Sequence, residues 1–120
     1  MNAFTIEVTS KYADWGRYNV RIMCELQDAA GRRTGYAATD SKEKGCTVLT
    51  TEPCEQLRMF VYAIPESLPA DRVVGDSPDF AGVLRVWCGD TKIGEERFDI
   101  NRWGGASIGR ICDSAGIKQE

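Results

Sequence analysis

The stretch YNVRIMCELQ, residues 18–27, decides the fold of this chain because polar and apolar side chains alternate along it. The apolar phase holds Val20, Ile22, Cys24 and Leu26, and the other phase holds Asn19, Arg21, Met23, Glu25 and Gln27. A period of two places successive side chains on opposite faces of a β-strand. The stretch therefore predicts a strand with one buried face and one face toward solvent.

The same alternation recurs on both sides of this stretch, and no window has the period of an amphipathic helix. Strands are predicted over 3–9, 18–26, 32–39, 46–51, 56–64, 81–88, 92–100 and 107–112. About eight short strands separated by turn residues favour two packed antiparallel layers. We expect an all-β, single-domain antiparallel β-sandwich, jelly-roll or immunoglobulin-like, over residues 1–112. Residues 113–120 are expected to form a frayed C-terminal tail.

The connecting segments divide into two sets if each strand runs antiparallel to the one before it. Loops at 10–16, 40–45, 65–80 and 101–106 then share one end of the sandwich, which we call the loop pole. The tight turns at 28–31 and 89–91 and the corner at 52–55 share the other end. Binding residues are concentrated on loops held by a rigid scaffold, so the loop pole is the predicted contact surface.

The candidate binding residues of the loop pole are two tryptophans, each with an arginine one or two positions away, and two aspartates. They are Trp15, Arg17, Asp76, Asp79, Arg102 and Trp103. Two exposed indoles beside two guanidinium groups would stack a sugar or clamp an extended peptide, with cation–π contacts adding to the affinity. The alternative is that both tryptophans fold inward and cover the end of the core, as large aromatic residues commonly do.

The glycine-rich stretch NRWGGASIGR, residues 101–110, raises the question of a phosphate-binding loop. Such a loop needs Gly-x-x-x-x-Gly-Lys-Ser/Thr followed by a helix. Here the spacing from Gly104 to Gly109 is one residue short, Arg110 replaces the Lys-Ser/Thr pair, and no helix is predicted to follow. We interpret the stretch as a bend, with an anion-binding nest of backbone amides as the alternative.

One quarter of the chain, residues 57–86, resembles a stretch of the calcium-dependent lipid-binding sandwiches first described in protein kinase C. In both, a strand leads into an aspartate-rich loop and leaves through an Asp-Phe-x-Gly segment, here DFAG at 79–82. Those domains place an Asp-x-Asp where this chain has Ala63-Ile64-Pro65. Calcium takes about six to eight oxygen ligands, so the resemblance implies the architecture more than the ion.

Charge and hydropathy exclude two classes of partner. The formal net charge is −3, and the basic residues are spread along the chain. Nucleic-acid binding needs a concentrated basic patch, so the composition argues against it. No apolar run approaches the length of a membrane span, and the first residues lack a signal-peptide pattern. We therefore expect a cytoplasmic protein without a membrane span.

The sequence has no histidine and five cysteines, which limits the chemistry available to it. Without histidine, Ser-His-Asp and Cys-His nucleophiles are excluded, and we expect no enzyme activity. Glu95 and Glu96 are neighbours in a strand, so their carboxylates point to opposite faces. The cysteines form no Cys-x-x-Cys pair, and a zinc site built from scattered thiolates is the alternative to isolated thiols. We expect free thiols and no metal or cofactor.

These observations lead to an expected function and two alternatives. We expect a non-catalytic binding or assembly module whose partner is a protein, either itself or another. A carbohydrate-binding or calcium/lipid-binding sandwich is the second hypothesis, and a histidine-free hydrolase is the third. The predicted strand at 32–39, with Gly35, Ala37 and Ala38, is a candidate sheet edge for self-association into a homo-oligomer.

Overall fold

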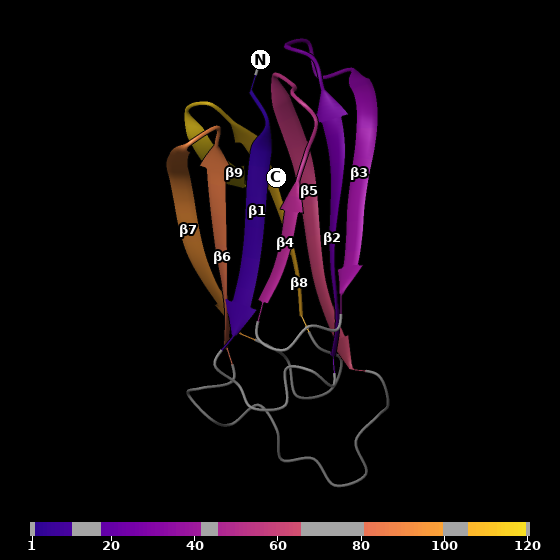
Figure 1. Cartoon of the computed structure of the whole chain (residues 1–120), viewed down its shortest axis with the longest axis vertical. Coiled ribbons are helices and arrows are strands. Elements are labelled where there is room, and N and C mark those ends of the chain that lie inside the picture. Colours follow the sequence, from indigo (N-terminus) through magenta and orange to yellow (C-terminus); the bar gives the residue numbers. More distant parts are fainter. Residues whose placement is uncertain (1, 11–17, 42–45, 66–80, 100–105, 120) are drawn as a thin grey trace, which may run out of the picture.

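The computed structural model describes residues 2–10, 18–41, 46–65, 81–99 and 106–119, and these form two antiparallel sheets packed face to face (Figure 1). The strands are β1 Phe4–Ser10, β2 Tyr18–Gln27, β3 Arg33–Ser41, β4 Cys46–Thr50, β5 Gln56–Pro65, β6 Ala81–Cys88, β7 Thr91–Asp99, β8 Ala106–Asp113 and β9 Gly116–Gln119. One sheet has the order β4-β1-β6-β7 and the other β3-β2-β5-β8-β9. The predicted all-β sandwich is confirmed, and these residues include no helix that could cross a membrane.

The eight predicted strands are all present, with ends that differ from the prediction by one or two residues at most. The segment predicted as a C-terminal tail instead contains a hairpin to a further strand, β9, which pairs with β8. In this hairpin the Asp113 carboxylate accepts a hydrogen bond of 2.8 Å from the Ala115 amide. Gly116 has φ 143, a conformation that favours glycine. The strand was missed because four residues are too few to show an alternation.

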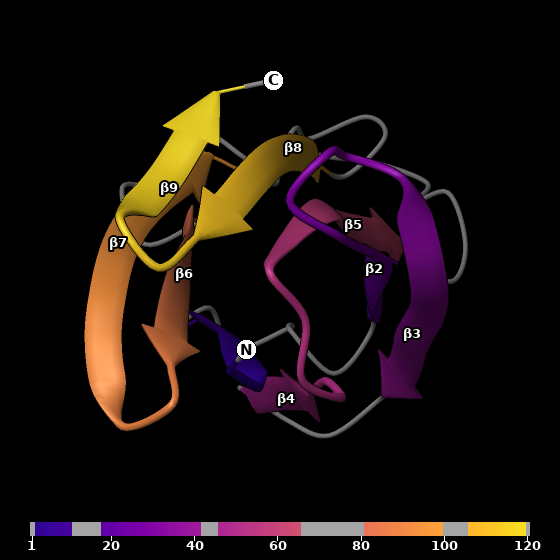
Figure 2. The same ribbon diagram turned by 90° about the horizontal axis from the view of Figure 1, so that it is seen from above.

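Figure 2 shows the two sheets facing each other, and the core between them is formed by the apolar phase of each central strand. The four inward positions predicted in residues 18–27, namely Val20, Ile22, Cys24 and Leu26, are all buried. In β5, Leu57, Met59 and Val61 are buried, while Phe60 and Tyr62 lie half-buried on the outer face of the sheet. Full burial of such an aliphatic side chain is worth about 1.5–3 kcal/mol, which makes this layer the main source of stability.

Two glycines allow close packing next to the edge strand β7. A Cβ atom at Gly82 of β6 would overlap the ring of Phe98, its partner on β7. A Cβ atom at Gly94 of β7 would overlap Ile117 of β9, which belongs to the other sheet. The missing side chain at Gly94 therefore lets the two sheets approach each other where β7 and β9 lie side by side.

The strand ends divide the molecule into two distinct poles (Figure 1). At one end, hydrogen bonds join the N-terminal segment to the turns: Gly89 N to Ala3 O at 2.8 Å and Cys54 N to Asn2 O at 3.1 Å. The tight turns predicted at 28–31 and 89–91 and the corner at 52–55 lie at this end, as expected. The strand ends that flank 11–17, 42–45, 66–80 and 100–105 lie together at the opposite end.

Candidate functional site

The predicted binding residues of the loop pole lie outside the described residues. They are Trp15, Arg17, Asp76, Asp79, Arg102 and Trp103. Whether they meet on one surface therefore stays a prediction. The structure does describe the strands on which this surface would be built, because the ends that flank each of these segments are at one pole.

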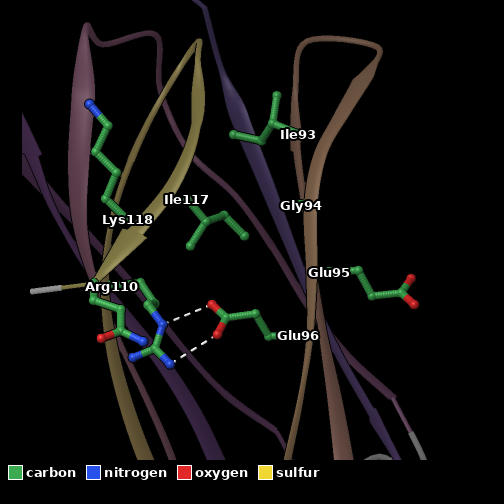
Figure 3. Close-up of a pocket in the computed structure, with 8 residues that line it drawn as sticks. Ile93, Gly94, Glu95, Glu96, Arg110, Ile117 and Lys118 are labelled. Carbon is green, nitrogen blue, oxygen red and sulfur yellow. Dashed lines mark hydrogen bonds and ion pairs between the residues drawn. The ribbon is translucent and has the colours of Figure 1, made fainter.

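A cavity of about 300 Å³ opens where β7 meets the β8–β9 hairpin (Figure 3). We call it the seam pocket. It is lined by Ile93, Gly94, Glu95, Glu96, Arg110, Ile117, Lys118 and Gln119. The side chains of Glu96 and Arg110 point toward each other across it, whereas Glu95 leaves β7 on the other side. Its volume is at the lower limit of small-molecule sites.

An ion pair between the two sheets occupies the seam pocket. Arg110 Nε lies 2.8 Å from Glu96 Oε2, and Arg110 Nη2 lies 2.9 Å from Glu96 Oε1. Arg110 Nη1 also donates to the Gly109 carbonyl oxygen at 2.7 Å. The side chains are 20% and 29% exposed, and the hydrogen bonds from Arg110 to Glu96 raise the pKa of Arg110. These two hydrogen bonds join the sheets. Because the Glu96 carboxylate neutralises the Arg110 guanidinium, the ion pair has no net charge to attract an anion.

The ion pair was not predicted from the sequence, although a signal for it is present. Arg110 shares the inward phase of β8 with Ile108 and Cys112, and Glu96 shares the inward phase of β7 with Phe98. A charged residue in the apolar phase of a strand needs a partner. The signal for the ion pair is therefore the presence of two oppositely charged residues, each in the apolar phase of its own strand.

A second group of charges lies on the outer face of the four-stranded sheet. Arg85 donates to Glu7 Oε1 at 3.0 Å and to Glu95 Oε1 at 2.8 Å, and Lys92 donates to Glu95 Oε1 at 2.6 Å. The hydrogen bonds from Lys92 and then Arg85 lower the pKa of Glu95. Glu95 is therefore an ionised structural carboxylate at neutral pH rather than a proton donor.

All five cysteines are free thiols, as predicted. Cys24, Cys54 and Cys112 are buried. Burial raises the pKa of Cys24 and of Cys112 to about 12. The thiolate is the form that attacks electrophiles and binds metals, so these side chains are inert at neutral pH. Within the described ranges, no three Cys, Asp or Glu residues are grouped so as to hold a metal ion.

Comparisons with known proteins identify no relative of this chain: no family model, no curated protein and no solved structure matches it.

Proposed function

We propose that this chain is a non-catalytic binding or assembly module whose contact surface is the loop pole. The observation that supports the proposal is the gathering of strand ends from both sheets at one end of the sandwich. The segments between those ends contain the two tryptophans, the two arginines and the two aspartates of the predicted site. Loops that share one end of a rigid sandwich are the common place for recognition.

The described part of the molecule has the properties of such a scaffold. The core is continuous between the sheets, and the Arg110–Glu96 ion pair joins them at the seam. The pole opposite the loops is closed by short turns that are hydrogen-bonded to the N-terminal segment. The charges on the outer face of the four-stranded sheet also neutralise one another. They are those of Glu7, Arg85, Lys92 and Glu95. A rigid scaffold lowers the entropic cost of presenting loops to a partner.

The partner that fits the predicted residues best is an extended segment of a protein. Indole rings provide large rigid contact area, and neighbouring guanidinium groups donate to backbone carbonyls and carboxylates. A carbohydrate would use the same indoles by stacking, and calcium would use the aspartates. These two alternatives are separated from a protein partner by the experiments below.

A photo-crosslinking amino acid placed at position 103 tests the proposal in the cells that make the protein. We expect a discrete crosslinked species from position 103, and also from position 15. Trp87 is the matched control, because it is on β6 next to the turn at Gly89, at the pole away from the loops. Crosslinks from position 87 alone, or none from positions 15 and 103, would contradict a contact surface at the loop pole.

Binding measurements with purified protein separate the partner classes. If the ligand is a sugar, a glycan array binds the wild-type chain and Trp87→Phe but not Trp103→Ala. If calcium is the ligand, millimolar calcium raises the melting temperature and Asp79→Asn abolishes the increase. Turnover in a hydrolase panel that a single carboxylate substitution removes would show that the non-catalytic assignment is wrong.

A further inference from the structure

β9 pairs with only half of β8. β8 extends over Ala106–Asp113, and the pairing with β9 covers Arg110–Asp113. Residues 106–109 pair with β5 along one edge, whereas along the other edge they pair with no strand that the structure describes. Unpaired backbone N–H and C=O groups at the edge of a sheet are a template for an added strand. We call residues 106–109 the open segment of β8.

The seam pocket lies next to the open segment, at the level where β9 ends. Arg110 directly follows the open segment in the chain and pairs with Gln119 of β9, and both residues line the pocket. On the side toward the hairpin turn the two sheets touch, because Ile117 fills the space that a Cβ atom at Gly94 would occupy. Figure 3 shows this region and, beyond it, Arg110 facing Glu96 of β7. A strand that continued the line of β9 along the open segment would therefore begin at the pocket.

Arg110 has two N–H groups without an acceptor among the described residues. A guanidinium has five N–H groups. Nε and Nη2 each donate one to the Glu96 carboxylate, and Nη1 donates one to the Gly109 carbonyl oxygen. One N–H on Nη1 and one on Nη2 remain. The three hydrogen bonds fix the plane of the guanidinium, so the two remaining N–H groups are held in position for an acceptor in the pocket.

Glu96 provides acceptor sites beside these donors. A carboxylate can accept about four hydrogen bonds, and Arg110 supplies two of them. The ion pair therefore presents donors next to acceptors and has no net charge. A planar amide has the complementary pattern, because its C=O accepts from Arg110 while its N–H donates to Glu96. A carboxylate or phosphate ligand would meet the Glu96 carboxylate as well as the guanidinium, so the ion pair favours a neutral amide.

An amide can belong to a small carboxamide or to a peptide, and the open segment of β8 favours the peptide. A small carboxamide would contact the ion pair alone. An extended peptide that lies antiparallel to β8 would bind the ion pair with one peptide group and hydrogen-bond the open segment with the groups that follow. Ile93 and Ile117, which also line the pocket, provide apolar contact for one of its side chains. The ion pair and the unpaired backbone therefore select the same occupant.

We infer that an extended peptide segment of a partner protein binds at the seam, antiparallel to the open segment of β8, with one of its peptide groups on the Arg110–Glu96 ion pair. The segment continues the line of β9, so the edge of the five-stranded sheet is then paired along the full length of β8. This surface consists of described strands and shares none of the six residues predicted at the loop pole, so the inference goes beyond the proposed function.

Arg110→Lys tests the recognition of the amide. Lysine keeps a positive charge opposite Glu96 but loses the planar fork of N–H donors. A phage library of random decapeptides, panned against the full chain, should yield peptides that bind in the micromolar range, because one added strand is smaller than a standard interface. Arg110→Lys should raise the dissociation constant of such a peptide about tenfold or more. Arg85→Lys is the matched control, since Arg85 pairs with Glu7 and Glu95 on the outer face, and it should bind as the wild-type chain does.

Circular dichroism establishes that both variants are folded. The inference is overturned if no enriched peptide distinguishes the wild-type chain from Arg110→Lys, or if Arg85→Lys weakens binding equally. NMR spectroscopy of the wild-type chain with a bound peptide locates the contact without any variant. We expect nuclear Overhauser effects between the peptide backbone and residues 106–109, and slower hydrogen exchange of the amides there. Effects confined to other strands or to the loop pole also overturn the inference.

A small amide probe and the loop pole supply the remaining controls. If N-methylacetamide shifts the side-chain N–H signals of Arg110 but no peptide binds, the ligand is a small carboxamide and the peptide is ruled out. Crosslinks from position 103 should persist in Arg110→Lys, because the loop pole is a separate surface. Their absence from the wild-type chain would contradict the proposed function, whereas the peptide measurements alone decide the inference at the seam.

Discussion

At the scale of single residues, glycine and cysteine have effects here that a sequence pattern does not show. Gly82 and Gly94 interrupt the alternation of their strands, and the sequence does not tell which side chain fills the space. The structure identifies Phe98 and Ile117 in these places. The cysteines were more predictable, since Cys24 lies in the apolar phase of its strand and is buried like its neighbours.

Gly82→Ala should lower the free energy of unfolding by about 1–3 kcal/mol, because the new methyl group overlaps the Phe98 ring. Adding Phe98→Leu should recover part of the loss, since a smaller side chain leaves room for the methyl group. Gly35→Ala is the control and should change stability by no more than about 1 kcal/mol. Urea titration of monomeric protein gives the free energy of unfolding of the wild-type chain, Gly82→Ala, Gly82→Ala/Phe98→Leu and Gly35→Ala. If Gly82→Ala and Gly35→Ala lose equal stability, overlap with the Phe98 ring is not the cause.

Alkaline pH should destabilise the fold through the buried thiols. Folded Cys24 and Cys112 keep their protons up to a pKa of about 12. The unfolded chain releases these protons from about pH 8.5. Above that pH the unfolded state binds fewer protons, so the free energy of unfolding falls by up to about 1.4 kcal/mol per pH unit for each thiol. Urea titrations between pH 8 and pH 11 give the free energy of unfolding at each pH. This free energy should fall less steeply with pH in Cys24→Ala/Cys112→Ala than in the wild-type chain. An equally steep fall would show that the two buried thiols are not its cause.

At the scale of elements, a period of two was sufficient to locate eight strands but not their partners. The central strands β2 and β5 were predicted almost to the residue because each has a long uninterrupted alternation or apolar run. β9 was missed because it is short and half-exposed. The ion pair between Glu96 and Arg110 was not predicted, although both charged residues lie in the apolar phase of their strands. Which residues meet across the two sheets depends on the strand order, and the alternation within a single strand does not reveal that order.

The ion pair between the sheets can be tested by replacing one or both of its members. Glu96→Leu leaves the Arg110 guanidinium in the seam pocket without its carboxylate, and should lower the free energy of unfolding by about 1–3 kcal/mol. Glu96→Leu/Arg110→Met replaces both charges with apolar groups and should recover most of that loss. A double-mutant cycle by urea denaturation gives the coupling energy. Additive losses would show that the two side chains contribute separately.

At the scale of the whole molecule, the two poles differ in structure (Figure 1). One pole is closed by short turns and the N-terminal segment, and the other collects the strand ends around the predicted site. The assumption that each strand reverses the direction of the one before it was sufficient to predict this division, and it holds even where consecutive strands such as β1 and β2 lie in different sheets. The arrangement of Trp15, Arg17, Asp76, Asp79, Arg102 and Trp103 could not be predicted, because loop conformation is not set by the period of the strands.

The core joins the sheets into one cooperative unit, and this is testable by hydrogen exchange. Ile6 of β1 and Met59 of β5 belong to different sheets but to the same buried cluster. Ile6→Ala should lower the free energy of unfolding by about 2–5 kcal/mol. If the sheets unfold together, the exchange free energy of the β5 amides falls by the same amount as that of the β1 amides. If the β5 amides keep their wild-type protection in Ile6→Ala, the five-stranded sheet is stable without the four-stranded sheet. Two layers that unfold independently could not hold the strand ends of both sheets in a fixed arrangement at the loop pole.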